Sequence, residues 1–106
     1  MKAKKSYGQH FLNNEHLAQE IAESLRLDQC QKVLEVGPGK GMLTQYLLQR
    51  KLDLLVVEAD RDMVRYLENN FPALEDQIIP GDFMKVDLQL FFEDQPFALI
   101  GNYPYN

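Results

Sequence analysis

The sequence has one cysteine, no tryptophan and no long apolar run, and these absences exclude several classes of protein. Cys30 alone among 106 residues cannot form an intramolecular disulfide, so the chain is not a disulfide-stapled domain. No apolar stretch approaches the ~18 residues of a membrane-spanning helix, and no apolar segment follows the N-terminal lysines as a secretory signal requires. We therefore expect a cytoplasmic protein with no membrane partner.

Basic residues are also scarce. Sixteen acidic against eleven basic residues give a net charge of -5, which argues against a self-sufficient nucleic-acid binder. The charge is unevenly placed, because Lys2, Lys4 and Lys5 lie within the first five residues and leave a net -8 for the rest of the chain. A basic arm thus precedes an acidic body, unless the lysines simply form a solvated terminus.

The composition, 45% hydrophobic and 25% charged, is that of one globular domain, and no repeat or linker interrupts it. Apolar spacing predicts helices over 15–26 and 42–50, and a helical turn at 88–92. A third helix is predicted to begin at a cap by Asp60 and to end before Pro72. Strands are predicted at 32–36, 52–57, 77–79 and 97–100. Strands alternating with helices indicate a parallel, doubly wound sheet. We expect strand order 3-2-1-4, with the fold truncated after its fourth parallel strand and that strand left as an exposed apolar edge.

A glycine-rich segment, residues 34–41, lies where the first predicted strand turns into the next helix. Open parallel sheets bind ligands at this place, and glycine permits both a tight turn and close approach to the backbone. Glu58 ends the second predicted strand, 21 residues beyond Gly37. An acid at that position can accept hydrogen bonds from both ribose hydroxyls of an adenosine.

Several interpretations of this loop compete. A dinucleotide fingerprint requires glycine or alanine where Met42 stands, and a phosphate-binding P-loop requires glycine at Leu34 and serine or threonine at Gly41. A turn with only a structural role would account for two glycines. It accounts less easily for three glycines together with an acid, Glu58, at the end of the next strand. The remaining spacing, E-x-G-x-G-x-G, resembles the first motif of S-adenosylmethionine-dependent methyltransferases, whose cofactor carries ribose and adenine but no phosphate.

Residues 81–83, Gly-Asp-Phe, follow the third predicted strand. The carboxylate of Asp82 can accept a hydrogen bond from the adenine amino group of a bound cofactor. The alternative is an aspartate that only stabilises a turn.

Residues 102–105, Asn-Tyr-Pro-Tyr, follow the fourth predicted strand and look like the N-[LIP]-P-[YF] motif of methyltransferases that act on adenine amines. The side-chain oxygen of Asn102 and the carbonyl of Pro104 can hold the hydrogens of an exocyclic amine, and Tyr105 can stack on an extruded base. Taken alone, this tetrapeptide would favour a surface turn rich in asparagine and proline over a catalytic motif.

In order and spacing, five segments closely resemble the KsgA-type ribosomal RNA adenine dimethyltransferases, and together they span nearly the whole chain: 7–12, 35–41, Glu58, 81–83 and 102–106. The cofactor-binding residues that the resemblance implies are His10, Leu12, Gly37, Gly39, Glu58, Asp82 and Asn102. It implies catalytic roles for Asn102, Pro104 and Tyr105, with Asn102 bridging the cofactor and the target base.

Two residues depart from the family's usual pattern. Tyr103 stands where leucine or isoleucine is usual, which we expect to alter packing rather than chemistry, and His10 replaces a common asparagine. His10 and His16 have no cysteine or carboxylate cluster at metal-site spacing, so we expect no metal site.

The resemblance also implies a domain organisation and an activity. Residues 1–14 would be a basic arm that lines the cofactor pocket, and residues 15–106 the N-terminal part of a methyltransferase domain. The parent enzyme would use S-adenosyl-L-methionine to dimethylate N6 of adjacent adenosines in small-subunit ribosomal RNA, on the pre-ribosomal small subunit. The alternatives are a large-subunit methyltransferase of the antibiotic-resistance type, or a non-catalytic cofactor-binding half-domain that self-associates through its exposed edge strand.

Overall fold

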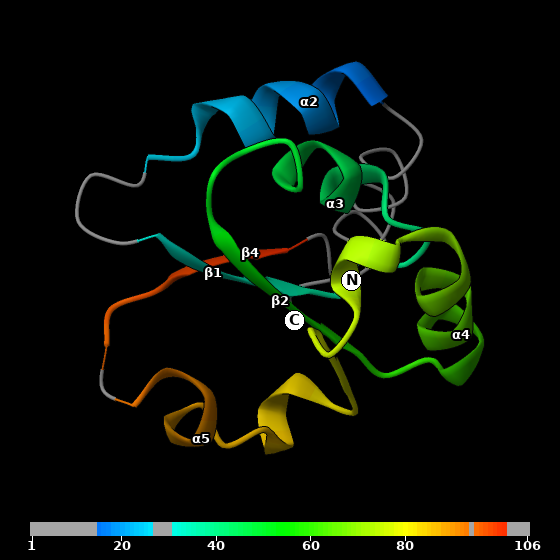
Figure 1. The fold of residues 1–106 in the computed structure, drawn as a ribbon, viewed down its shortest axis with the longest axis vertical. Coiled ribbons are helices and arrows are strands. Elements are labelled where there is room, and N and C mark those ends of the chain that lie inside the picture. Colours follow the sequence, from blue (N-terminus) through cyan, green and yellow to red (C-terminus); the bar gives the residue numbers. More distant parts are fainter. Residues whose placement is uncertain (1–14, 27–30, 94, 102–106) are drawn as a thin grey trace, which may run out of the picture.

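The computed structural model describes residues 15–26, 31–93 and 95–101 of the chain. Four strands form its central sheet: β1 (Lys32–Val36), β2 (Asp53–Glu58), β3 (Ile78–Pro80) and β4 (Ala98–Gly101). They pair in parallel in the order β3-β2-β1-β4 (Figure 1). The predicted α/β class and strand order are therefore confirmed. No helix within the described residues has the length and apolarity to cross a membrane.

Within the described residues, α2 (Glu15–Ser24) precedes the sheet. The helices between the strands are α3 (Met42–Leu47), α4 (Arg61–Asn70), the 3-10 helices η1 (Pro72–Leu74) and η2 (Phe83–Lys85), and α5 (Gln89–Phe92). Figure 1 shows α2 and α3 on one side of the sheet and α5 on the other. The helix predicted over 42–50 ends at Leu47, because the amides of Gln49 and Arg50 bond to carbonyls three residues back and tighten the last turn.

Each face of the sheet has its own buried cluster, because successive side chains of a strand point to opposite faces. Val33 packs with residues of α2, α3 and α4, whereas Leu34 packs with Val36, Val57 and Phe92 on the α5 side. Strands buried on both faces are typical of parallel sheets, and this burial holds the carboxyl ends of β1 and β2 side by side.

Helix α4 begins and ends as the sequence predicts. The Asp60 carboxylate accepts hydrogen bonds from the amides of Asp62 (2.8 Å) and Met63 (3.4 Å), which otherwise have no partner within the helix. The helix ends at Asn70, and Pro72 begins η1.

A side chain that the sequence analysis did not single out connects α2 to α3. Arg50 follows α3 and donates from Nη1 to the carbonyls of Ala22 (2.8 Å) and Leu25 (2.6 Å) at the end of α2. These carbonyls belong to the last turn of a helix, where no intrahelical donor reaches them. The guanidinium therefore fixes where α2 ends relative to α3.

We expect Arg50→Ala to lower the free energy of unfolding by about 2 kcal/mol, because it removes charge-assisted hydrogen bonds from two partly buried carbonyls. Urea denaturation of the variant and the unaltered protein measures this difference. Arg65→Ala, which removes an exposed arginine from α4, is the matched control and should change the value by less than about 0.5 kcal/mol. Equal effects of the two substitutions would contradict the role of Arg50.

Candidate functional site

The glycine loop, residues 37–41, lies between the end of β1 and the start of α3. Its backbone dihedral φ is 70° at Gly37, 58° at Gly39 and 85° at Gly41, in the left-handed region that favours glycine. At Gly41 an added Cβ would also lie 2.6 Å from the ring of Phe71. The glycines are thus required by the path of the chain as well as by any ligand.

Glu58, the last residue of β2, binds the glycine loop directly. Its Oε1 accepts a hydrogen bond from the Gly39 amide and its Oε2 one from the Asp60 amide, both at 2.9 Å. The side chain is 7% exposed. A carboxylate offers about four lone-pair positions, so two are not occupied by donors from the described residues and can accept from a ligand hydroxyl.

Asp82 follows β3 at the same edge of the sheet. Its Oδ1 accepts from the Met84 amide at 2.9 Å and caps η2, which leaves Oδ2 as a further acceptor. The preceding residue, Gly81, donates its amide to the Glu58 carbonyl at 2.9 Å. This bond brings the segment that carries Asp82 next to the end of β2.

A cavity of about 330 Å³ joins these elements. It is lined by Val36, Gly37, Val57, Glu58, Ala59, Gly81, Asp82, Phe83 and Met84. Among the described residues its walls are mostly apolar, and the charged side chains are the carboxylates of Glu58 and Asp82. Such a cavity matches a ligand with an apolar ring and hydrogen-bond donors better than a ligand with phosphates.

Two larger hollows lie elsewhere on the described chain. One, of about 510 Å³, lies between the end of α4 and β3, and the other, of about 430 Å³, reaches the amino ends of β1 and β2. Neither is lined by a residue of the glycine loop. Ligands of open parallel sheets bind at the carboxyl ends of the strands, so we take the cavity beside Glu58 as the candidate site.

Glu35 is a buried acid whose environment the sequence motif did not predict. It lies in β1, is 1% exposed, and its Oε1 accepts a 2.6 Å hydrogen bond from the Thr44 hydroxyl of α3. The pKa of Glu35 is raised from 4.5 to about 7. Burial is the largest cause, the Thr44 hydroxyl acts in the opposite direction, and the charge of Glu58 adds to the increase. The signal in the sequence was a lone acid inside the apolar strand Lys32–Val36.

The structure brings four of the predicted cofactor-binding residues together. Gly37, Glu58 and Asp82 line the cavity, and Gly39 bonds to Glu58. The other predicted site residues lie outside the described residues: His10, Leu12, Asn102, Pro104 and Tyr105. Strand β4 ends with Gly101, which pairs with Val36 directly before the glycine loop.

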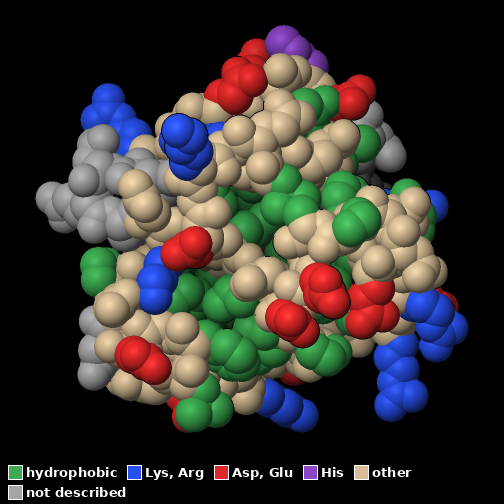
Figure 2. All heavy atoms as spheres, viewed as in Figure 1, with side chains coloured by type: hydrophobic (Ala, Val, Ile, Leu, Met, Phe, Trp, Pro, Cys, Tyr) green, Lys and Arg blue, Asp and Glu red, His purple; other side chains and the backbone are tan. Residues whose placement is uncertain are grey.

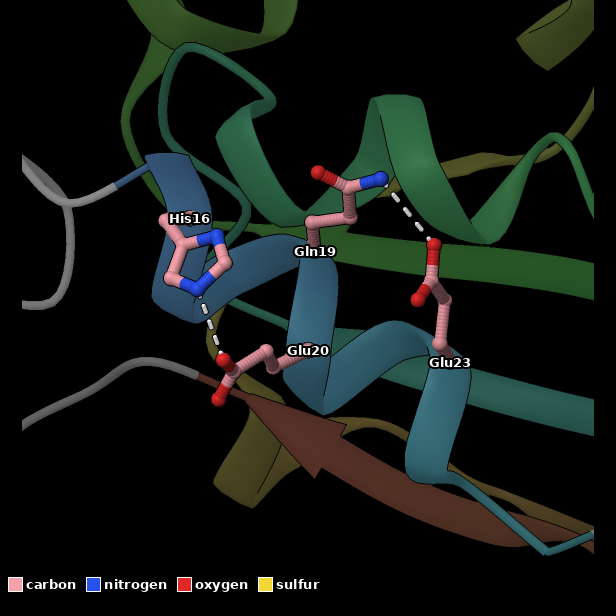
Figure 3. Close-up of polar contacts among 4 residues, drawn as sticks. All are labelled: His16, Gln19, Glu20 and Glu23. Atoms are coloured by element: carbon pink, nitrogen blue, oxygen red, sulfur yellow. Dashed lines mark hydrogen bonds and ion pairs between the residues drawn. The ribbon is translucent and has the colours of Figure 1, made fainter.

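His16 lies on the solvent side of α2. Its Nε2 contacts Oε1 of Glu20 at 2.7 Å, and one turn further on Gln19 donates to Glu23 at 3.0 Å (Figure 3). Both contacts join residues four positions apart on the same helix. Within the described part of the chain, no three or more histidine, cysteine or acidic side chains gather as metal ligands.

The glycine loop, the matched acid and the parallel sheet define a Rossmann-like fold of the kind found in S-adenosylmethionine-dependent methyltransferases. The 23S rRNA methyltransferase ErmE superposes with a TM-score of 0.68 at 28% identity, over 88% of this chain and 37% of that one. A putative S-adenosylmethionine-dependent methyltransferase from Methanococcus maripaludis shares the fold, with a TM-score of 0.52 at 18% identity, over 80% of this chain and 43% of that one.

The model of the ribosomal RNA adenine dimethylase family matches residues 1–106, and the chain belongs to this family. It is 48% identical to the ribosomal RNA small subunit methyltransferase A of Flavobacterium johnsoniae and 52% identical to that of Parabacteroides distasonis, over the whole chain in both cases. The chain spans 41% and 40% of the length of these two relatives.

The raised pKa of Glu35 predicts a pH-dependent stability. A group whose pKa is raised by folding stabilises the native state fully below its unfolded value, near 4.5, and this contribution is lost as the pH rises through about 7. We therefore expect Glu35 to lower the free energy of unfolding by an amount on the order of 3 kcal/mol between these limits. Glu35→Gln, which cannot titrate, should lack this decrease.

Urea denaturation between pH 4.5 and 8 tests this expectation. The difference in the free energy of unfolding between the unaltered protein and Glu35→Gln should change between pH 4.5 and about 7, and it should level off towards pH 8. Glu68→Gln, at an exposed position of α4, is the control and should give a curve parallel to that of the unaltered protein. Parallel curves for Glu35→Gln as well would show that Glu35 does not titrate there.

Proposed function

We propose that this chain is the N-terminal, cofactor-binding part of an enzyme that dimethylates N6 of adjacent adenosines in small-subunit ribosomal RNA during ribosome assembly. The observation that carries the proposal is the cavity at the carboxyl ends of β1 and β2. There the glycine loop lies beside two carboxylates, and none of the described residues that line the cavity is basic. The family model matches the chain from end to end.

The described residues fit S-adenosyl-L-methionine as the cofactor. The free acceptor positions of Glu58 suit the ribose hydroxyls, and Oδ2 of Asp82 suits the adenine amino group. Phe83 and Val57 give the cavity its apolar walls, and Gly37 presents backbone without a Cβ. When bound, the cofactor supplies an activated methyl group on its sulfonium.

His10 and Leu12 complete the proposed cofactor site from the N-terminal arm, and Asn102 contributes to it from the end of β4. We assign the catalytic step to Asn102, Pro104 and Tyr105. The Asn102 oxygen and the Pro104 carbonyl accept the hydrogens of the adenine amine and aim its nitrogen, while Tyr105 stacks on the extruded base. Alignment of a weak nucleophile is the protein's main task in such a displacement.

We favour small-subunit over large-subunit RNA as the substrate. The curated relatives named as small-subunit enzymes are 48% and 52% identical to this chain, whereas the 23S enzyme ErmE is 28% identical. Acidic and basic side chains are interspersed around the face shown in Figure 2, with apolar side chains at its centre. We therefore assign RNA affinity to the basic arm and to residues beyond these 106, and we place the enzyme in the cytoplasm with the assembling small subunit.

Asn102→Ala in the full-length protein should abolish methyl transfer to isolated small ribosomal subunits, because the amine loses one of its two acceptors. Binding of S-adenosylmethionine should be weakened but not lost, because the other proposed cofactor-binding residues remain. Transfer of a labelled methyl group and calorimetric titration measure the two properties. Asn69→Ala, at an exposed position of α4, is the control and should retain both.

Three results would contradict the proposal, each in a different part. Undiminished transfer by Asn102→Ala would remove Asn102 from the catalytic site. Methylation of large but not small subunits would favour the antibiotic-resistance type. Binding of NAD in place of S-adenosylmethionine would reject the cofactor itself.

We also propose that the 106-residue chain self-associates through β4. Within the described residues this strand pairs only with β1, and its Leu99 is 48% exposed. Unpaired apolar edges recruit further strands, so sedimentation should show concentration-dependent oligomers that Leu99→Lys dissociates. Met84→Lys, at a position 84% exposed beside the cavity, is the control and should leave them intact. A monomer at all concentrations would refute this part.

A further inference from the structure

Glu35 and Thr44 form a buried polar contact directly behind the glycine loop. Glu35 precedes Gly37 by two residues, and Thr44 follows Gly41 by three. Both side chains are buried, with 1% and 0% exposure, and they are joined by the 2.6 Å hydrogen bond from the Thr44 hydroxyl. The bond thus joins the strand that enters the loop to the helix that leaves it.

Other hydrogen bonds within the described residues also shape this loop. The Gly37 amide continues the sheet by donating to the Val57 carbonyl, and the Gly41 amide closes a turn onto the Pro38 carbonyl, both at 2.9 Å. The Gly39 amide donates to Glu58. Of the side-chain contacts at the loop, Glu58 holds its middle and Glu35 with Thr44 holds its two ends.

The position of Glu35 in the sheet shows that its carboxyl does not belong to the cavity wall. Its partners in the ladder are the apolar residues Val56 and Ile100, and it does not line the cavity that Glu58 lines. A buried carboxyl is costly unless it is hydrogen-bonded. Thr44 is its hydrogen-bond partner within the described residues, and Glu58 is the charged group whose field acts on it.

We propose that Glu35 and Thr44 are positioning residues for the cofactor: their hydrogen bond sets the separation of β1 and α3, and thereby the conformation in which the glycine loop meets the ligand. This inference rests on the proposed use of S-adenosylmethionine. An ionised Glu35 accepts a stronger hydrogen bond from Thr44 than a neutral one. Since the pKa of Glu35 lies near 7, the loop is held more firmly as the pH rises through neutrality.

The test compares Thr44→Val, which removes the hydroxyl at nearly constant shape, with Thr44→Ser, which keeps it. Calorimetric titration of the full-length protein with S-adenosylmethionine should show a Kd about tenfold weaker for Thr44→Val and unchanged for Thr44→Ser. Leu54→Val, a buried substitution at the amino end of β2, is the control for general destabilisation. It should leave the Kd unchanged, whereas an equal loss in Leu54→Val would overturn the inference.

The pH dependence gives a second readout that a purely structural role would not produce. The ratio of the Kd of Glu35→Gln to that of the unaltered protein should rise between pH 6 and 8, because the glutamine cannot ionise and any titration of the cofactor itself cancels in the ratio. A constant ratio, or full affinity in Thr44→Val, would overturn the inference while the proposed function stands. Failure of the unaltered protein to bind S-adenosylmethionine would overturn both.

Discussion

The candidate site depends on the carboxylate of Glu58, because this group accepts hydrogen bonds from backbone amides of two different loops. One oxygen accepts from Gly39 in the β1–α3 loop, and the other accepts from Asp60 in the turn that starts α4. The glycine loop and the turn that starts α4 are therefore held at a fixed separation beyond the ends of their strands. The walls of the cavity follow from that separation, since Gly37 of one loop and Ala59 of the other both line it.

The sheet makes this contact possible, and its burial makes the contact rigid. Parallel pairing sets Val36 opposite Val57 and Glu58 opposite Pro80, so three strand ends carry their following loops to one edge. Apolar clusters on both faces prevent the strands from sliding, because a shift by one residue would turn buried side chains outward. A carboxylate on a strand held in this way serves as a fixed acceptor for ligand hydroxyls.

The elements and their order could be predicted from the sequence because each rests on local patterns: apolar runs for β1 and β2, and the Asp60 cap for α4. The pairing of the glycines with Glu58 could also be predicted, since it follows from spacing along two adjacent strands. The hydrogen-bond partners of Glu58 and Glu35 could not be predicted. Spacing shows which segments lie close together, but it does not show which amide or hydroxyl donates to a given carboxyl oxygen. The contact of Arg50 with α2 likewise joins segments whose approach only packing determines.

The acidic balance of the chain acquires a specific meaning at this site. A net charge of -5 argued against nucleic-acid binding when spread over the whole sequence. In the fold, Glu58 and Asp82 line the cavity, and Glu35 lies buried next to the glycine loop. The oxygens of Glu58 and Asp82 can accept hydrogen bonds from hydroxyl and amino groups, and their negative charge repels phosphate. The same charge that favours a nucleoside carrying a sulfonium disfavours an RNA backbone at this point. On the proposed function, cofactor and RNA therefore require different surfaces, and the target adenine must approach the transferred methyl group while its phosphates stay away from this cavity.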